Sequence, residues 1–201
     1  SLDHPWATAP PGPTAGEVQP FSASGRTGSG ARLAVQRRLS NRARLSAGAV
    51  LLTRRDDRLN QRARGGISTD TTVADQRETV TEVGPFLSLH VEPTERLTVT
   101  GTTRYDRIRF QVADRYLGDG IDQSGTKTMA SGSGSLGTSY TFGGTAAIYG
   151  SLATAFETPT TTELVNQANG TIGFNLDLGP QRTVTTELGF RTDGVVAVTA
   201  A

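Results

Sequence analysis

The feature that most constrains the fold is the regular placement of leucine at Leu33, Leu39, Leu45 and Leu51. On an α-helix each step of six residues turns the side chain by about 240°, so these leucines would spread over three faces of the helix. On a β-strand the same spacing leaves all of them on one face, because side chains alternate between the two faces. The positions between them include Arg, Ser and Gly. The pattern therefore predicts half-buried strands.

The alternation of small or apolar residues with Arg, Thr, Ser and Glu continues along most of the chain. It predicts an all-β fold, an antiparallel meander of about eight long strands. The composition agrees, because 24 glycines weaken helices, 30 threonines favour strands, and a hydrophobic content of 35% leaves little material for a thick core. The expected strands are 22–39, 43–54, 77–91, 96–112, 127–141, 145–156 and 182–191, with an eighth that starts at 195.

The connections between these strands alternate in length. Short connections lie at 40–42, 92–95, 142–144 and 192–194, whereas a Pro-rich leading loop at 1–21 and the segments 55–76, 113–126 and 157–181 are long. Outer-membrane barrels place short turns on the periplasmic side and long loops outside. The lengths therefore predict part of a transmembrane β-barrel, with 55–76, 113–126 and 157–181 as its long outer loops.

Two details refine this expectation. Within 96–112 the apolar positions change from odd to even numbers near Asp106, which we interpret as a β-bulge or as an exit from the buried zone. Tyr140, Phe142 and Phe190 lie beside short turns, which predicts part of an aromatic girdle at the periplasmic interface.

Simple counts exclude several classes of protein. The chain has no cysteine, which excludes disulfide scaffolds, thiolate metal sites and cysteine nucleophiles. It has no apolar run of about 18 residues, which excludes a transmembrane helix but not a membrane β-barrel. The net charge is +1, and the Arg-rich segments 37–44 and 54–64 contain no aromatic residue for base stacking, so we expect no nucleic-acid partner.

Other short motifs favour structural roles. Residues 132–137 (GSGSLG) match G-x-G-x-x-G, yet the sequence around them predicts a strand and not the helix that a dinucleotide site requires. We interpret His4, His90, Glu163 and Glu187 as structural. The acidic pairs Asp56-Asp57 and Asp119/Asp122 are placed in outer loops, as solvated turn residues or as contacts for a cation. No residue is assigned a catalytic, cofactor-binding or metal-binding role, and the ligand-binding residues stay unknown.

Several short segments follow one another in an order that is itself informative. They are 97–106 (LTVTGTTRYD), 136–140 (LGTSY), 148–156 (IYGSLATAF) with 158–164 (TPTTTEL), and 175–182 (NLDLGPQR) with 187–191 (ELGFR). In this order and at this spacing, residues 80–191 resemble the β-barrel of TonB-dependent outer-membrane receptors. Residues 22–54 fit more loosely as an earlier hairpin.

The resemblance implies a barrel of the 22-stranded type, filled by an N-terminal plug that carries the box contacting TonB. We accordingly expect 1–201 to be a partial β-barrel domain, a curved open sheet in isolation, with the plug domain and the C-terminal closing strands absent. The resemblance also implies the bacterial outer membrane as location, with its lipid and lipopolysaccharide as partners. It implies TonB-driven uptake of a scarce solute such as a ferric siderophore, without enzymatic chemistry or a cofactor.

Two other classes stay open on the sequence alone. One is a small, complete eight-stranded outer-membrane barrel with a structural or adhesive role, in which the last strand would pair with the first. The other is a soluble β-sandwich or an enzyme, which would need no detergent to stay in solution. An open curved sheet would favour the receptor fragment, and a closed barrel would favour the small complete barrel.

Overall fold

The computed structural model describes residues 18–65, 67–165, 174–192 and 198–200, and it confirms an all-β meander. Eight strands form one antiparallel sheet in sequence order, so each strand is hydrogen-bonded to its neighbours along the chain. A single short helix interrupts the series. The elements are β1 (Val18–Ser40), β2 (Ala43–Arg64), β3 (Ile67–Val91), β4 (Leu97–Asp114), β5 (Gly125–Phe142), β6 (Ala146–Glu157), α1 (Thr161–Val165), β7 (Gln181–Thr192) and β8 (Val198–Ala200).

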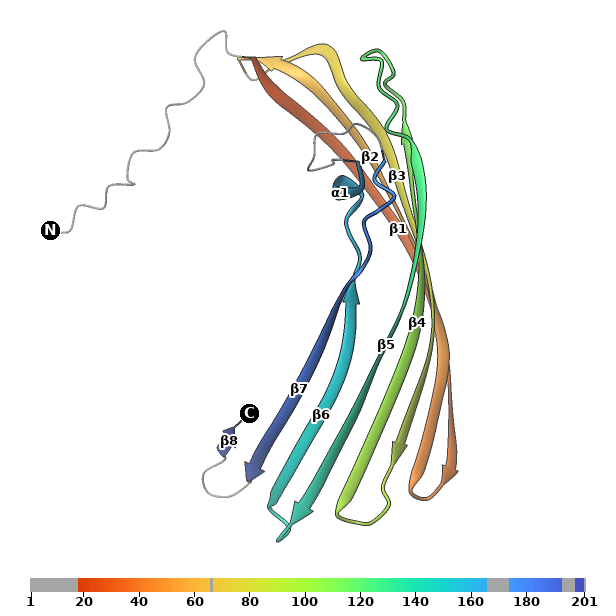
Figure 1. Ribbon diagram of the computed structural model, residues 1–201, viewed down its shortest axis with the longest axis vertical. Helices are drawn as coiled ribbons and strands as arrows, with labels where there is room; N and C mark the ends of the chain where they lie inside the picture. Colours follow the sequence, from red (N-terminus) through yellow and green to blue (C-terminus); the bar gives the residue numbers. More distant parts are fainter. Residues whose placement is uncertain (1–17, 66, 166–173, 193–197, 201) are drawn as a thin grey trace, which may run out of the picture.

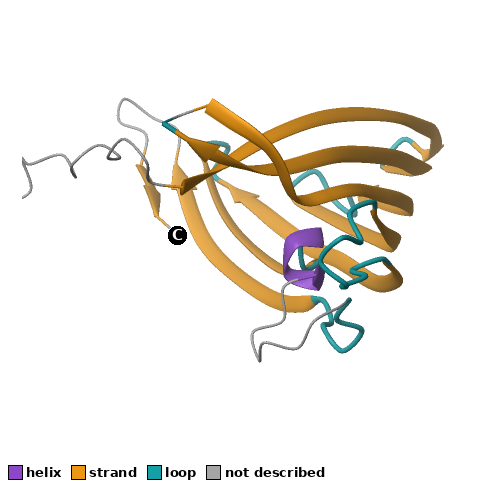
Figure 2. Cartoon of the chain, turned by 90° about the horizontal axis from the view of Figure 1, so that it is seen from above, coloured by secondary structure: helices purple, strands orange, loops and turns teal. Residues whose placement is uncertain are grey.

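The sheet is curved and open, as expected for an arc of barrel wall (Figures 1 and 2). Within the described part of the chain β1 pairs only with β2, and β8 only with β7, so the first and last strands do not close the sheet on each other. This is the arrangement that distinguishes an open arc from a small closed barrel. Helix α1 lies on the concave side, which we call the inner face; the opposite side is the outer face.

The prediction of a long loop at 55–76 is wrong. Residues 55–64 continue β2, residues 67–76 belong to β3, and the two strands meet at a tight connection where Gly65 has a φ of 59°. The reason is that strand pairing needs only backbone hydrogen bonds, so it continues beyond Thr53, near which the apolar alternation that marks the strand in the sequence ends. Residues 18–21, which were expected in the leading loop, belong to β1 instead, and the rest of the expected leading loop, 1–17, lies outside the described residues.

The change of phase near Asp106 is not a β-bulge. The pairing of β4 with β5 runs without a shift from Leu97 opposite Tyr140 to Val112 opposite Gly125. Even-numbered residues of β4 therefore stay on the inner face throughout. What changes is which face carries the apolar side chains. Up to Tyr105 they lie on the outer face, and from Ile108 onward they lie on the inner face, in the buried cluster around Leu164.

The outer face is apolar in the half of the sheet nearest the short turns, which we call the lower half. Register places its exposed side chains in rows that cross the sheet, and Leu89, for example, faces Gly101, which in turn faces Leu136. The band includes Leu33, Val35, Leu51, Val83, Leu87, Leu89, Tyr105, Leu136, Ile148, Leu152, Val184 and Leu188, all of them exposed.

The aromatic cluster expected at the short-turn end of this band forms. Tyr140 stacks with Phe142 at 6.5 Å between ring centroids, and Phe142 meets Phe190 at 6.1 Å. In the upper half it is the inner face of β4 and β5 that is apolar instead, where Ile108, Phe110 and Met129 form a buried cluster with Leu164. Among the described residues no helix is both long and apolar enough to cross a membrane.

Candidate functional site

The inner face of β1–β4 is rich in arginine, and most of these guanidinium groups are balanced by a carboxylate. Arg26 and Arg54 both pair with Asp56, the latter at 3.5 Å. Arg104 bonds Asp106 at 2.6 Å and also pairs with Glu82 on β3. The Arg26–Asp56 and Arg104–Glu82 pairs connect adjacent strands, and the other two pairs lie within one strand. They hold a polar wall whose positive charge is locally compensated.

The segment between β6 and β7 is described over 158–165 and 174–180, which we call the inward loop, and it folds back onto this wall through α1. Leu164 is completely buried, and it packs on Ile108, Phe110 and Met129 of β4 and β5. Val80 also packs against this cluster. A loop that only fringed the barrel would leave such a leucine in water, so burial of Leu164 fixes the loop inside the arc.

The start of α1 is fixed by a capping box. The Thr160 N–H and its hydroxyl donate to Glu163 Oε2 at 2.7 and 2.9 Å, and the Glu163 N–H donates to the Thr160 hydroxyl at 3.2 Å. These bonds from Thr160, its backbone N–H first, hold the pKa of Glu163 below its ordinary value. Glu163 thus has the structural role that the sequence suggested.

A buried carboxylate joins the inward loop to the wall. Glu78 of β3 is only 2% exposed, and its Oε2 accepts a hydrogen bond from the Thr161 hydroxyl. Arg58 Nη2 lies 3.4 Å from Glu78 Oε1 and donates to Thr162 Oγ1 at 3.3 Å. One charge pair therefore contacts two consecutive residues of α1, and the orientation of the helix on the wall is set by both.

Lower on the inner face lies a groove of about 570 Å³ with an aromatic base. The Arg32 guanidinium stands over the Phe86 ring, 4.9 Å from its centroid. Gly48 permits this, because a Cβ at that position would lie 2.6 Å from the Phe86 ring. The rest of the lining that faces inward by register is mainly hydroxyl-bearing: Ser46, Ser88, Thr102, Ser133 and Ser135, with Arg104 beside them.

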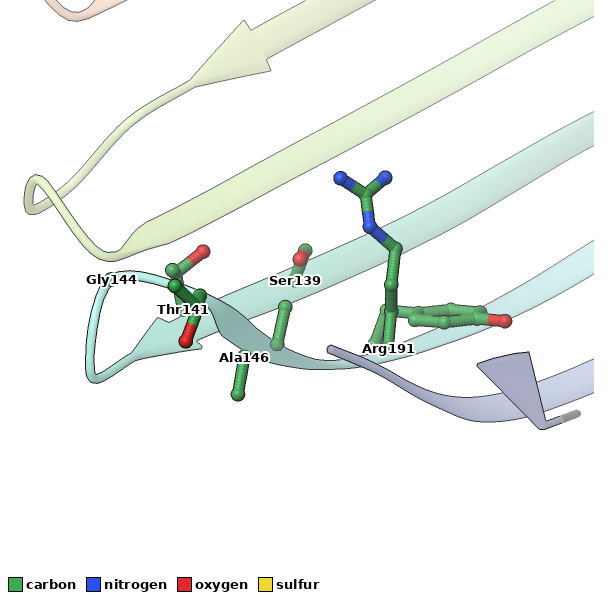
Figure 3. A pocket seen from close by; sticks show the side chains of 8 residues that line it. Ser139, Thr141, Gly144, Ala146 and Arg191 are labelled. Atoms are coloured by element: carbon green, nitrogen blue, oxygen red, sulfur yellow. The ribbon is translucent and has the colours of Figure 1, made fainter. Parts of the chain in front are cut away.

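A second depression, of about 580 Å³, lies at the short-turn end of the sheet (Figure 3). Its lining is small and polar, with Ser139 and Thr141 on β5 and Arg191 on β7. The Tyr149 ring lies against Gly189, where a Cβ would be 2.2 Å away. The surface thus carries hydroxyl groups and the Arg191 side chain.

The acidic residues singled out in the sequence serve local structure. Asp119 and Asp122 accept backbone N–H bonds from Ile121 and Ser124 at 3.0 and 2.8 Å, within the confirmed connection between β4 and β5. The pair at 56–57 was expected in a loop and instead lies on β2, where Asp56 faces inward and Asp57 outward. Asp57 bonds Arg77 at 2.8 Å.

The remaining candidate residues are placed as follows. His90 lies between Thr100 and Glu92, 3.1 Å from an oxygen of each, and His4 lies outside the described residues. The G-x-G-x-x-G segment at 132–137 lies within β5, as the strand reading required. No group of three or more potential metal ligands occurs in the part of the chain that the structure describes.

Sequence reasoning missed the groove and the role of Glu78. The signal for the groove was Phe86, a single large aromatic residue at an inward position among serines and threonines. Arg32 and Phe86 are 54 positions apart and separated by a strand, so only the register brings them together. Glu78 sits in a segment whose alternation of charge and threonine carries no apolar signal.

An open arc of long antiparallel strands, apolar outside and polar inside in its lower half, with an inward-folded loop above, defines a wall of a bacterial outer-membrane β-barrel. The particular family follows from comparison: residues 6–201 match the family described as TonB dependent receptor-like, beta-barrel, and the chain belongs to that family.

Solved structures agree on the fold. The copper transporter OprC superposes with a TM-score of 0.72 at 19% identity, over 87% of this chain and 28% of that one. The unliganded ferric citrate transporter FecA gives 0.69 at 14% identity, over 89% and 26%. The ferric yersiniabactin uptake receptor FyuA from Yersinia pestis gives 0.60 at 15%, over 91% and 28%. The chain thus spans less than a third of the length of these proteins.

Proposed function

We propose that this sheet is one arc of the barrel wall of a TonB-coupled receptor, and that the receptor takes up a scarce, negatively charged solute such as a ferric siderophore. The family supports TonB as the energy-coupling partner. The structural neighbours carry copper or ferric chelates according to their names, which supports a metal chelate as the solute class. The charge and the aromatic surface of the inner face favour one kind of chelate over others.

The observation that supports an anionic chelate as the solute is the groove around Phe86. Among the described residues Arg32 has no carboxylate partner, so its charge is available to a ligand, and Phe86 offers a flat apolar surface beside it. A chelate with a carboxylate or catecholate oxygen and a planar ring would satisfy both. The surrounding hydroxyl groups accept or donate hydrogen bonds without adding charge.

In this proposal the inward loop narrows the route from outside to the groove, because α1 covers the upper inner face. The polar depression at the short-turn end faces the segment that fills the barrel. Transport then requires rearrangement of that filling segment, driven through TonB, and no covalent chemistry at this wall.

The test compares two arginines of the same strand that lie on opposite faces. Arg32→Gln removes the inner-face charge, and Arg37→Gln, the matched control, removes an exposed outer-face charge near the first short turn. Cells that carry the protein in their outer membrane are supplied with radioactive iron as hydroxamate, catecholate or carboxylate chelates. We expect one anionic chelate class to be taken up, with affinity about tenfold weaker for Arg32→Gln and unchanged for Arg37→Gln. Uptake of a neutral chelate only, or equal affinity in both variants, would refute the proposal.

A further inference from the structure

On the inner face, next to the groove, two carboxylates share one guanidinium. Arg104 Nε donates to Asp106 Oδ1 at 2.6 Å, and Arg104 Nη2 also pairs with Glu82 of β3. We call Glu82, Arg104 and Asp106 the acidic triad. It has two formal negative charges and one positive charge, and no other cation of the described ranges forms an ion pair with it. One negative charge is therefore left unbalanced.

The members of the acidic triad differ in how far a solute can reach them. A Cβ at Gly84 would lie 2.2 Å from Asp106 Oδ1 and 2.6 Å from Arg104 Nη2, so the triad lies directly on the β3 backbone at this residue. The Asp106 side chain is 5% exposed, whereas the Glu82 side chain is 28% exposed. Glu82 is thus the carboxylate that a solute can contact, and Asp106 lies behind it as a charge that water screens less.

A buried hydroxyl beside the acidic triad lacks a partner. Ser131 of β5 lies directly opposite Asp106 in the register of the two strands. It is 2% exposed, and its Oγ has no hydrogen-bond partner among the described residues. Buried polar groups are rarely left unpaired, because an unmade hydrogen bond costs free energy. The site therefore has room for a hydrogen-bonding group that the described part of the wall does not supply.

The acidic triad and the groove share Arg104, which lines the groove and lies opposite Phe86 in the register. Glu82 is four residues from Phe86 along β3, a distance of about 13 Å. Arg32 stands over the same Phe86 ring from β1. A solute ring on Phe86 therefore has an unpaired positive charge on one side and an unbalanced negative charge above it.

We infer that the anionic solute also carries a cationic amine, which binds beside Glu82 while the anionic group binds Arg32. This inference rests on the proposed function and adds the charge pattern of the solute to it. An ammonium group supplies hydrogen-bond donors to Glu82 and the positive charge that the acidic triad lacks. A second anionic group in the same place is repelled. The wall thus favours zwitterionic metal chelates over uniformly anionic ones.

The experiment compares three forms of one chelate that differ only at an amine. The probe is ferric dihydroxybenzoyl-lysine, which has a catechol ring, a carboxylate and a free side-chain amine. Acetylation of the amine removes its positive charge, and succinylation replaces that charge by a negative one. Binding of the radioactive iron chelates is measured on chilled cells that carry the protein in their outer membrane. We expect the acetylated form to bind about tenfold more weakly than the free amine and the succinylated form more weakly still.

A pair of variants assigns this preference to the acidic triad. Glu82→Gln removes the accessible charge but keeps an acceptor for Arg104, so the three forms should bind with nearly equal affinity. Glu95→Gln is the matched control, because it removes the charge of a carboxylate that is 90% exposed in the short turn between β3 and β4. It should keep the order of the parent protein. Heat-shift electrophoresis, which distinguishes folded from unfolded barrels, shows whether each variant folds.

Equal binding of the three forms by the parent protein would overturn the inference, and that measurement needs no variant. A folded Glu82→Gln protein that keeps the order of the parent would overturn it as well. The proposed function is tested separately, because Arg32→Gln should weaken binding of all three forms by the same factor. If Arg32→Gln has no effect while the order persists, the role of Arg32 is refuted and that of the acidic triad stands.

Discussion

Replacing Leu164 by alanine tests the claim that one buried side chain holds the inward loop on the wall. Leu164 is fully buried against Ile108, Phe110 and Met129. Truncation removes about three methyl or methylene equivalents from an apolar site and leaves a cavity, which together cost about 3 kcal/mol. Because the strands are held by their own ladders, this cost falls on docking of the loop and not on the sheet.

At about 1.4 kcal/mol per tenfold change, the fraction of time the loop spends undocked should rise roughly a hundredfold. Hydrogen exchange of the protein in detergent, followed in peptides covering 160–165 and 174–178, measures this directly. Leu176→Ala is the matched control, since Leu176 lies in the same loop but is 65% exposed. Unchanged protection in Leu164→Ala, or equal loss in both variants, would show that the loop is held by something else.

Two further predictions concern the groove and the cap. Gly48→Val should impair folding or displace Phe86, because a Cβ would lie 2.2 Å from a backbone oxygen and 2.6 Å from the Phe86 ring; Gly137→Ala, with no contact closer than 4.0 Å, should be tolerated in the same heat-shift assay. The pKa of Glu163 is depressed by its bonds from Thr160, so the cap contributes fully above the ordinary value of about 4.5 and is lost as pH falls through the lower folded value. Exchange of the 160–165 amides should therefore accelerate in acid, and Glu163→Gln should weaken that dependence.

The strands of the lower half could be predicted because lipid imposes a strict alternation on them. Leu33 and Leu51 must face outward and Arg32 inward, and period two is visible without any knowledge of pairing. In the upper parts of β2 and β3, above the membrane, most side chains on both faces meet water or polar neighbours, so the alternation disappears while the ladder continues. This is why β2 extends to Arg64 and β3 begins at Ile67, where a loop was expected.

The candidate site was harder to predict because its parts are joined by register alone. Arg32, Phe86 and Glu78 carry no local motif, and their meaning depends on which residues lie opposite them on neighbouring strands. Glu163 is the exception. Its partner Thr160 is three residues away, so the capping box can be recognised from the spacing of the two residues in the sequence.

The apolar side chains of β4 lie on the outer face in its lower part and on the inner face in its upper part. The register of β4 with its neighbouring strands is therefore fixed by two separate sets of side chains. A slip of one residue would turn Ile108 and Phe110 toward the outer headgroups and drive Arg107 and Arg109 into the cluster around Leu164. The same slip would place threonines such as Thr100 in the hydrocarbon. The same shift of register is therefore destabilising at both ends of β4, in the buried cluster at one end and in the hydrocarbon layer at the other. No shift by one residue can improve the burial at one end without worsening it at the other.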